Sequence, residues 1–258
     1  AAEARLLTRL QYDNTVHDLV GDMDAPAQRF PAENTLLGFG NNADAHRASL
    51  LLAEQHLSAA EGVAARAIAR GLDSLLPCDG GDRSEACVSR FISEFGYRAY
   101  RRPLAGDESQ GMLGLFRAAN GEWGFEKGVE LVLQAFLQSP QFLYRTESLA
   151  DSNAGRVGDG SVVLDSYQVA SRLSYFLWNT MPDAELFALA DAGQLTSTEV
   201  VRAQAERMLD DERARQTVAD FHEQWLGLAQ FAGLTRVVPD TDVTNGLNAN
   251  WADSLAQF

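Results

Sequence analysis

The chain has 258 residues, enough to bury a sizeable hydrophobic core in one large domain or in two to three small ones. Hydrophobic residues make up 46% and charged residues 22%, which are ordinary globular values and exclude disorder as the default. Lys and Arg number 21 against 36 Asp and Glu, so the formal net charge is −15. Such a charge disfavours binding to nucleic acid or anionic lipid, and it suits high solubility or a basic partner.

The sequence shows no membrane-spanning or targeting segment. No window has enough consecutive apolar residues to span a bilayer. Residues 1–5 carry no basic region followed by an apolar stretch, so no signal peptide is visible. A mature, processed chain would look the same, and this absence therefore does not argue for the cytoplasm.

Helical periodicity dominates the start of the chain. Apolar residues spaced along one side predict a helix over 2–20, which Gly21 ends. A loop rich in Asp, Pro, Asn and Gly follows over 22–42, and a long Ala-rich helix is predicted from about 44 to 75. These elements form a first, N-terminal helical module over 1–76.

The two cysteines, Cys78 and Cys87, bracket a short polar loop that contains two glycines. This geometry suits a local disulfide, provided that the two Cα atoms come within about 7 Å. A zinc site would need further ligands, and no histidine lies nearby in sequence. The spacing is also wrong for a Cys-x-x-Cys redox pair or for haem attachment. We therefore predict a disulfide, which implies an oxidising, extracytoplasmic compartment.

A second helical module, which contains both cysteines, is predicted over 77–150. Asp82 and Glu85 have the spacing of a capping box, in which an acceptor side chain at the N-cap is followed by Glu three residues later. Three helices are expected in this module: one that breaks near Pro103, one from Asp107, and one over 124–138. The last helix ends because the residue before Pro140 disfavours the helical conformation.

The stretch 151–160 is the clearest linker in the sequence. It contains three glycines and no bulky residue except Val157. Its acidic residues also suggest a calcium loop, but the EF-hand order of ligands and the closing bidentate Glu are missing. A solvated linker is therefore the better interpretation.

The third helical module is predicted over 161–258, and it begins with another capping box, formed by Asp165 and Gln168. Helical patterns continue from there to about Leu228. The final stretch, 251–258, also has a helical pattern but stops in mid-turn, so we expect the natural protein to continue beyond it.

Strand evidence is confined to two short stretches, 161–164 and 236–238. Strands as short as these make at most one marginal β-pair. The sequence therefore predicts an all-α fold, built as a multi-helix array of three consecutive helical modules.

The four histidines predict no metal site, because none is paired with another at helical spacing. His222 stands out, since it lies between Phe221 and Trp225 on a helix whose other face is apolar. An imidazole in that place could act as an axial haem ligand or as a general base. The alternative is a partly buried histidine that is satisfied by a carboxylate or a backbone group.

A basic cluster, formed by Arg98, Arg101 and Arg102, is unusual in so acidic a chain. Guanidinium groups bind anions through two parallel hydrogen bonds, so this cluster could clamp an anionic ligand. The preferred interpretation is an internal ion-pair hub that holds helices together.

Other catalytic patterns are absent from the sequence or lack specificity. It contains no Gly-x-Ser-x-Gly elbow, no phosphate-binding glycine loop and, once the cysteines are paired, no free thiol nucleophile. Paired carboxylates of the glycosidase type are compatible with the composition, but 36 acidic residues make a chance pair common.

Several stretches resemble a bacterial family that is common in planctomycetes and myxobacteria. The first module carries RLLTRLQYDNTVHDLVG at 5–21 and GFGNNAD at 38–44. The later modules carry FGYRAYRRPL at 95–104, SPQFLYR at 139–145, ASRLSYFLWNTMPD at 170–183 and QWLGL at 224–228. These strings are similar to the domains of unknown function numbered 1587, 1595 and 1592, in that order. Two positions depart from the pattern: His17 stands where Arg is expected, and Gly40 where Asp is expected.

The resemblance implies a secreted or periplasmic protein. In the family's full architecture, the three modules precede a region with a Cys-x-x-Cys-His haem-attachment motif and often follow a cytochrome-like domain. Neither motif occurs in this chain. The resemblance therefore implies the helical portion of a c-type haem protein, an oxidoreductase or electron carrier. Its haem-bearing part lies outside this chain and is its expected partner, with a basic redox partner as a further expectation.

Three side chains are candidates for the surroundings of such a haem: Met181, Met208 and His222. Two other hypotheses stay open. The chain could be a non-enzymatic interaction or scaffold module of a cell-surface complex, which a large exposed apolar face would favour. It could also be a polysaccharide-acting enzyme, which would require two carboxyls in a cleft flanked by Trp178 or Trp225.

Overall fold

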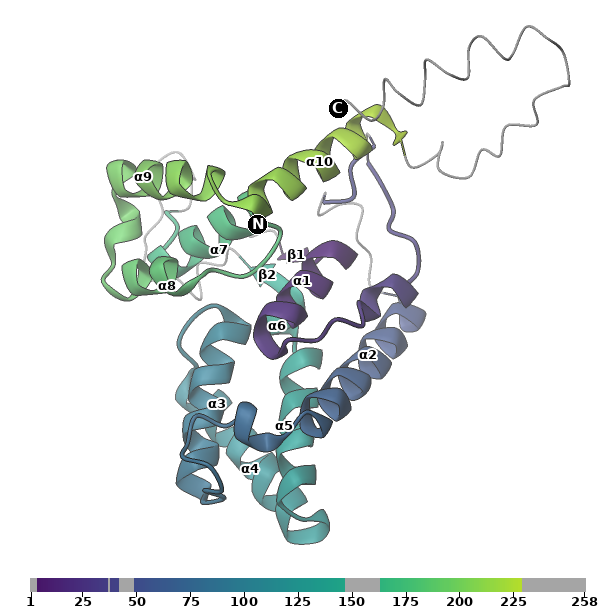
Figure 1. The fold of residues 1–258 in the computed structure, drawn as a ribbon, viewed down its shortest axis with the longest axis vertical. Helices are drawn as coiled ribbons and strands as arrows, with labels where there is room; N and C mark the ends of the chain where they lie inside the picture. The colour runs from purple at the N-terminus through teal and green to yellow at the C-terminus, as the bar shows by residue number, and fades with distance from the viewer. Residues whose placement is uncertain (1–3, 37, 42–48, 147–162, 229–258) are drawn as a thin grey trace, which may run out of the picture.

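The computed structural model describes residues 4–36, 38–41, 49–146 and 163–228. Within these ranges the fold is all-α, as predicted, with one short antiparallel strand pair (Figure 1). The predicted linker 151–160 and the final stretch 251–258 lie outside the described residues.

The first helix, α1 (Arg9–Val20), begins later than the sequence predicts. Its N-cap is Thr8, whose hydroxyl accepts a hydrogen bond from the Gln11 backbone N–H at 3.2 Å, while the Gln11 side chain accepts from Thr8 at 3.3 Å. Upstream of this capping box, β1 (Ala4–Leu6) is extended because it pairs with β2 (Tyr144–Thr146). The predicted end at Gly21 is confirmed, since this residue adopts the left-handed conformation with φ 67°.

The rest of the first module consists of a short 3₁₀ turn, η1 (Pro26–Arg29), and the long α2 (Leu50–Ala69), followed by η3 (Leu72–Ser74). The N-cap of α2 is Ser49, and its hydroxyl accepts from the Leu52 N–H at 3.1 Å. The described helix is therefore shorter than the predicted one, whose residues 44–48 lie outside the described ranges.

In the second module, residues 77–146 contain four helices: α3 (Glu85–Tyr100), α4 (Gly106–Trp123), α5 (Phe125–Gln138) and the single turn α6 (Pro140–Leu143). The N-cap of α3 is Ser84 and not Asp82, because the Ser84 hydroxyl accepts from the Cys87 N–H at 3.2 Å. Asp82 instead accepts from the Ser84 N–H at 2.8 Å, in the loop before the helix. The predicted end of α5 before Pro140 is confirmed.

The third module contains α7 (Ser166–Leu177), α8 (Ala184–Asp191), the 3₁₀ turn η4 (Gln194–Thr196), α9 (Thr198–Leu209) and α10 (Glu212–Leu226). The predicted capping box of α7 is confirmed, with hydrogen bonds in both directions between Asp165 and Gln168 at 2.8 and 3.1 Å. The predicted strand at 161–164 is wrong in its described part, because Val163 and Leu164 belong to no strand. Residues 236–238 lie outside the described ranges.

The buried apolar side chains form two clusters. The first spans the first and second modules, with Val16, Val63, Phe91 and Phe136 among its members, and it also takes in Tyr175 and Met181 of the third. The second belongs to the third module and includes Trp178, Leu186, Leu195 and Met208. Figure 1 shows the same division, with α2 to α5 at one end of the molecule, α7 to α9 at the other, and α10 extending outward.

Polar side chains at the end of α7 connect the third module to α1. Asn179, which has a positive φ of 52°, accepts a hydrogen bond from Gln11 through its side chain at 3.1 Å. Thr180 donates to the Asp18 carboxylate at 2.6 Å. A second connection joins α3 to the third module, where Tyr97 of α3 and Tyr167 of α7 both donate to one oxygen of Asp191, at 2.9 and 2.6 Å. Together these contacts fix the position of α7 against α1 and α3.

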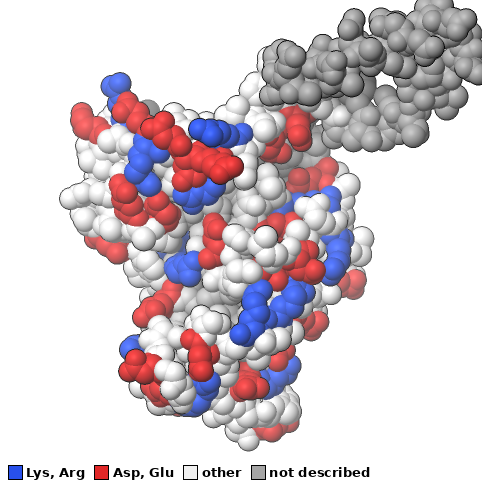
Figure 2. Space-filling view, in the orientation of Figure 1, with Lys and Arg blue, Asp and Glu red and all other residues white. Residues whose placement is uncertain are grey.

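Among the described helices, none combines the length and apolar character that a membrane span requires. The charge on the visible face is mixed rather than segregated. Figure 2 shows acidic and basic residues interspersed over this face of the molecule. The net charge of −15 therefore does not gather here as one acidic patch.

Candidate functional site

A cleft of about 660 Å³ lies between α7 and α10. This volume falls within the range of roughly 300–1,000 Å³ that is typical of small-molecule sites. One wall comes from α7, another from α10, and the turn that carries Phe39 completes it. The cleft is thus assembled from the first and third modules, with Arg145 from the second. Asn179, which accepts from Gln11 on α1, also donates to the Thr217 hydroxyl on α10 at 3.3 Å and so connects the end of α7 to the other wall.

The wall formed by α10 and the Phe39 turn is aromatic. Phe39 stacks on Phe221, with ring centroids 5.5 Å apart and planes at 17°. Phe221 in turn lies 6.1 Å from Trp225, with planes at 26°. On the opposite wall Phe176 is 71% exposed. Trp225, which follows on α10 but is not among the residues that line the cleft, is 63% exposed. An exposed apolar surface of this kind marks a ligand or partner site.

The Phe39 turn is held against α10 by a chain of hydrogen bonds. The Gly40 N–H donates to the Gln224 side chain at 3.0 Å, and the Gln224 amide donates to Asp220 at 2.8 Å. Gly38 has a φ of 89°, which favours glycine. A Cβ added at Gly40 would lie 3.1 Å from a carboxylate oxygen of Glu33. The aspartate that the family resemblance leads one to expect at position 40 would bring a second negative charge close to the Glu33 carboxylate.

His222 lies on the cleft wall and is exposed rather than partly buried. Its Nδ1 lies 2.7 Å from the Val218 carbonyl oxygen. Because a carbonyl oxygen only accepts, Nδ1 must donate, and the neutral imidazole then carries its lone pair on Nε2. The predicted backbone partner of His222 is therefore the Val218 carbonyl, which binds Nδ1. The other ring nitrogen, Nε2, keeps the lone pair that a metal ligand or a general base uses.

Asp220 is the one carboxylate among the described residues that line the cleft. Burial raises the pKa of its carboxyl, while the hydrogen bond from Gln224 opposes that rise. A paired-carboxylate site of the glycosidase type needs a second carboxyl, and Trp178, one of its expected flanking residues, is only 1% exposed. The described part of the cleft therefore does not favour that chemistry.

Arginines gather around Tyr175 at the α7 side of the cleft. Arg5 and Arg145 are directly opposite one another in the strand pair. The Arg145 guanidinium carbon lies 4.9 Å from the centroid of the Tyr175 ring. Arg172 is three residues before Tyr175 on α7, so it occupies the same helix face. All three arginines line the cleft.

The two candidate methionines lie away from the cleft. Met208 is completely buried in the core of the third module, where its backbone carbonyl accepts from the Trp178 indole at 2.9 Å. Met181 is buried in the core shared by the first two modules. Neither side chain lines the cleft, so the structure does not bring them together with His222.

The basic cluster predicted from the sequence holds the backbone together. Arg101 is only 4% exposed and donates to the carbonyl oxygens of Gln141, Phe142 and Tyr144, at 2.6, 3.2 and 3.0 Å. It also donates to the Tyr175 hydroxyl at 3.3 Å. The buried guanidinium thus ties α3 to α6, β2 and α7 through neutral oxygen atoms.

The other two arginines of this cluster also bind groups of the protein. Arg98 donates to the Asp18 carbonyl at 2.6 Å, which connects α3 to α1. Arg102 makes two parallel hydrogen bonds with Glu108, both 2.9 Å. One of the three therefore forms an ion pair, and the other two bind backbone carbonyls, which favours a structural hub over an anion clamp.

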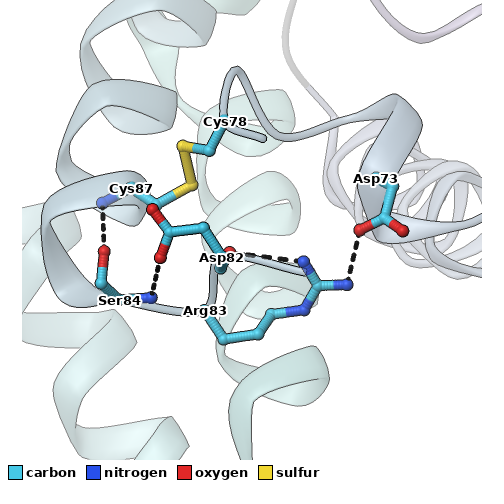
Figure 3. The surroundings of a disulfide bond; sticks show 6 residues. All are labelled: Asp73, Cys78, Asp82, Arg83, Ser84 and Cys87. Atoms are coloured by element: carbon cyan, nitrogen blue, oxygen red, sulfur yellow. Dashed lines mark hydrogen bonds and ion pairs between the residues drawn. A yellow bond between two sulfur atoms is a disulfide. The ribbon is translucent and has the colours of Figure 1, made fainter. Parts of the chain in front are cut away.

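The predicted disulfide between Cys78 and Cys87 is confirmed, with Cα atoms 6.0 Å apart (Figure 3). Arg83, inside the loop, donates to the Asp73 carboxylate at 2.8 Å and closes the loop against η3 (Figure 3). The two sulfurs and an Asp82 oxygen lie within 4.8 Å of one another. Sulfurs in a disulfide are not thiolates, so this group can hold a metal only after reduction.

Sequence reasoning found His222 but missed the rest of the cleft. It placed Phe221 and Trp225 on an apolar helix face without showing that this face is exposed. Phe39, Phe176 and Arg145 come from three distant stretches, and no local pattern connects them. The sequence did contain one signal for the cleft. Apolar residues recur along α10 to the end of the helix, but of these only Ala214 belongs to the buried cluster of the third module.

Three family models match consecutive stretches of the chain. The model described as PSD3, protein of unknown function (DUF1587), matches residues 5–69. PSD5, protein of unknown function (DUF1595), matches 87–147, and PSD4, protein of unknown function (DUF1592), matches 164–257. No curated protein and no solved structure matches the chain. The cleft therefore joins residues of the first and third matched stretches, and Arg145 adds one from the second.

Proposed function

Because this chain belongs to the family that carries DUF1587, DUF1595 and DUF1592 in tandem, we propose that it is the helical body of an extracytoplasmic c-type haem protein. The protein acts in oxidoreduction or electron transfer, and its haem is attached outside this chain. The cleft between α7 and α10 is the surface that meets the haem-bearing part. The observation that carries this proposal is the pairing of an exposed aromatic cleft with His222 on its wall.

The residues of the cleft fit a haem in three respects. Its wall of Phe39 and Phe221 offers flat apolar faces to a flat apolar ring. His222 keeps the lone pair on Nε2, because Nδ1 donates to Val218. The arginines around Tyr175 match the negative charge of haem carboxylates. Met181 and Met208 do not fit as ligands, because both are buried in the cores.

A bound c-type haem supplies one-electron transfer. With such a haem against the cleft, the aromatic wall would exclude water, and the Val218 carbonyl would hold the imidazole of His222 in place through Nδ1. The Cys78–Cys87 disulfide supports an oxidising compartment, in agreement with an extracytoplasmic location.

The test uses the natural protein that contains this chain. His222→Ala should shift the haem absorption spectrum or the reduction potential, because it removes an imidazole from the surroundings of the iron. His17→Ala is the matched control, since His17 is exposed on α1 and does not line the cleft. Identical spectra and potentials in the wild type and His222→Ala would show that the cleft does not meet the haem.

A second candidate is a non-enzymatic interaction or scaffold module. The exposed apolar side chains of α10, among them Val218, Phe221 and Trp225, favour it, because they are available for docking whether or not a haem is present. Oxidative footprinting separates the candidates. If α10 is protected in the natural protein relative to the 258-residue chain, but no c-type haem is present, the scaffold function holds and the haem function fails.

A further inference from the structure

A smaller pocket, of about 240 Å³, lies where the first turns of α2 meet the strand pair. Its described lining is mostly apolar and holds no Lys, Arg, Asp or Glu side chain. The apolar part consists of leucines from β1, α2 and α6, namely Leu6, Leu52, Leu57 and Leu143. None of the residues that line this pocket lines the cleft between α7 and α10. A ligand of this pocket is therefore independent of the proposed haem contact.

His56 is the side chain of this pocket that the fold leaves without a hydrogen bond. It is only 6% exposed, and neither of its ring nitrogens has a hydrogen-bond partner among the described residues. An unpaired buried polar group costs free energy, so such groups almost always have a partner. A leucine at this position would avoid the cost. The imidazole therefore indicates a partner that the described part of the chain does not supply.

Aromatic neighbours hold the His56 ring in place. Phe30 packs against it with ring centroids 4.5 Å apart, and Tyr12 packs against it at 5.5 Å. Neither of these residues lines the pocket, so the pocket meets the imidazole from another side. Burial lowers the pKa of His56 to about 4, and the ring is therefore neutral at neutral pH. A neutral imidazole offers one N–H donor and one acceptor nitrogen.

The chemistry of the lining restricts the class of ligand. A metal ion needs several ligands, and the described lining contains one histidine and no carboxylate or thiol. A charged molecule would lose its hydration here, and no charged side chain of the described lining would offset that loss. A purely apolar molecule would leave His56 unpaired. A hydroxyl group both donates and accepts, so it matches either nitrogen of a neutral imidazole.

We propose that this pocket binds a small neutral molecule with one hydroxyl group on an apolar body, such as an alcohol or a phenol. The hydroxyl group forms a hydrogen bond with His56, and the apolar body lies against the leucines. An apolar cavity of about 150 Å³ is large enough to hold benzene. The volume of about 240 Å³ therefore accommodates a substituted ring.

The experiment is a ligand-observed NMR titration of the 258-residue chain with 4-methylphenol and 1,4-dimethylbenzene. The two probes have nearly the same shape, and a methyl group replaces the hydroxyl group in the second. In the wild type, 4-methylphenol should bind. His56→Phe keeps an aromatic ring but removes both nitrogens, so it should weaken binding of 4-methylphenol about tenfold and leave that of dimethylbenzene unchanged. Because each probe is compared with itself, the difference in hydrophobicity between the two cancels.

Two outcomes of this titration would overturn the proposal. If 4-methylphenol does not bind the wild type, the pocket does not take this class of ligand. If His56→Phe leaves the affinity for 4-methylphenol unchanged, or lowers the affinities for both probes equally, the hydroxyl group does not pair with His56.

A second pair of variants locates the site on α2. Ala53 lines the pocket and is exposed, so Ala53→Phe should weaken binding of both probes about tenfold or more, because the larger side chain occupies the pocket. Ala65→Phe is the matched control, since Ala65 is exposed on the same helix and does not line the pocket. Unchanged binding in Ala53→Phe would place the probes elsewhere and contradict the proposal. These titrations contain no haem, so their failure leaves the haem proposal standing, and a natural protein without haem leaves this pocket standing.

Discussion

At the scale of single residues, burial decides which polar side chains lack hydrogen-bond partners, and the sequence alone does not show this. His56 and Tyr12 are both buried, and neither the His56 nitrogens nor the Tyr12 hydroxyl has a hydrogen-bond partner among the described residues. Their rings lie 5.5 Å apart, and His56 also packs on Phe30 at 4.5 Å. The spacing of His56 on a long helix predicted none of this, because its neighbours come from other parts of the chain.

The burial of His56 predicts a pH-dependent stability. Desolvation lowers its pKa from 6.5 to about 4, so between these values the unfolded chain binds a proton that the folded chain does not. The free energy of unfolding should therefore fall as the pH drops from 6.5 to 4, by up to about 3 kcal/mol, and this contribution is complete above pH 6.5. Urea denaturation of the wild type and His56→Leu across this range measures the difference.

In that comparison the other titrating groups cancel, because both proteins contain them. His17→Leu serves as the control, since His17 is exposed on α1. A stability difference between the wild type and His56→Leu that stays constant from pH 4 to 6.5 would show that His56 titrates normally in the folded chain.

At the scale of elements, helix ends were predictable and long-range pairing was not. Gly21, Pro140 and the Asp165 capping box each act within a few residues, so the sequence alone locates them. The strand β1 depends on its partner β2, far along the chain, and local periodicity therefore assigned its residues to a helix. The cap of α3 was misplaced from Ser84 to Asp82, because both residues are good acceptors and only the geometry separates them.

The close packing of α4 on α5 gives a test at this scale. A Cβ at Gly128 on α5 would lie 2.8 Å from the Phe116 ring, so Gly128→Ala should lower the free energy of unfolding by about 1–3 kcal/mol. Gly111→Ala on α4 is the matched control: its Cβ meets nothing within 4 Å, and it should stabilise by about 0.5–1 kcal/mol. Urea denaturation compares the two, and equal effects would contradict the described packing.

At the scale of the whole molecule, the three tandem modules do not each form a separate core. The first and second share one hydrophobic cluster, which also takes in Tyr175 and Met181 of the third, and the third has a second cluster of its own. The fold class and the disulfide followed from the sequence, because periodicity and cysteine spacing are local. The cleft could not be predicted from the sequence, because Phe39, Phe176 and Phe221 come together only when the first and third modules pack against each other. Its exposed aromatic wall is the feature on which the proposed function rests.

The proposal that this chain forms the helical body of a c-type haem protein is tested most directly by a pyridine haemochrome spectrum. The sample is the natural protein that contains the chain, purified from an extracytoplasmic fraction. We expect the absorption of a covalently attached c-type haem, retained after denaturation and extraction with acid and organic solvent. A spectrum without any c-type haem signal would contradict it and leave the cleft as a binding surface of another kind.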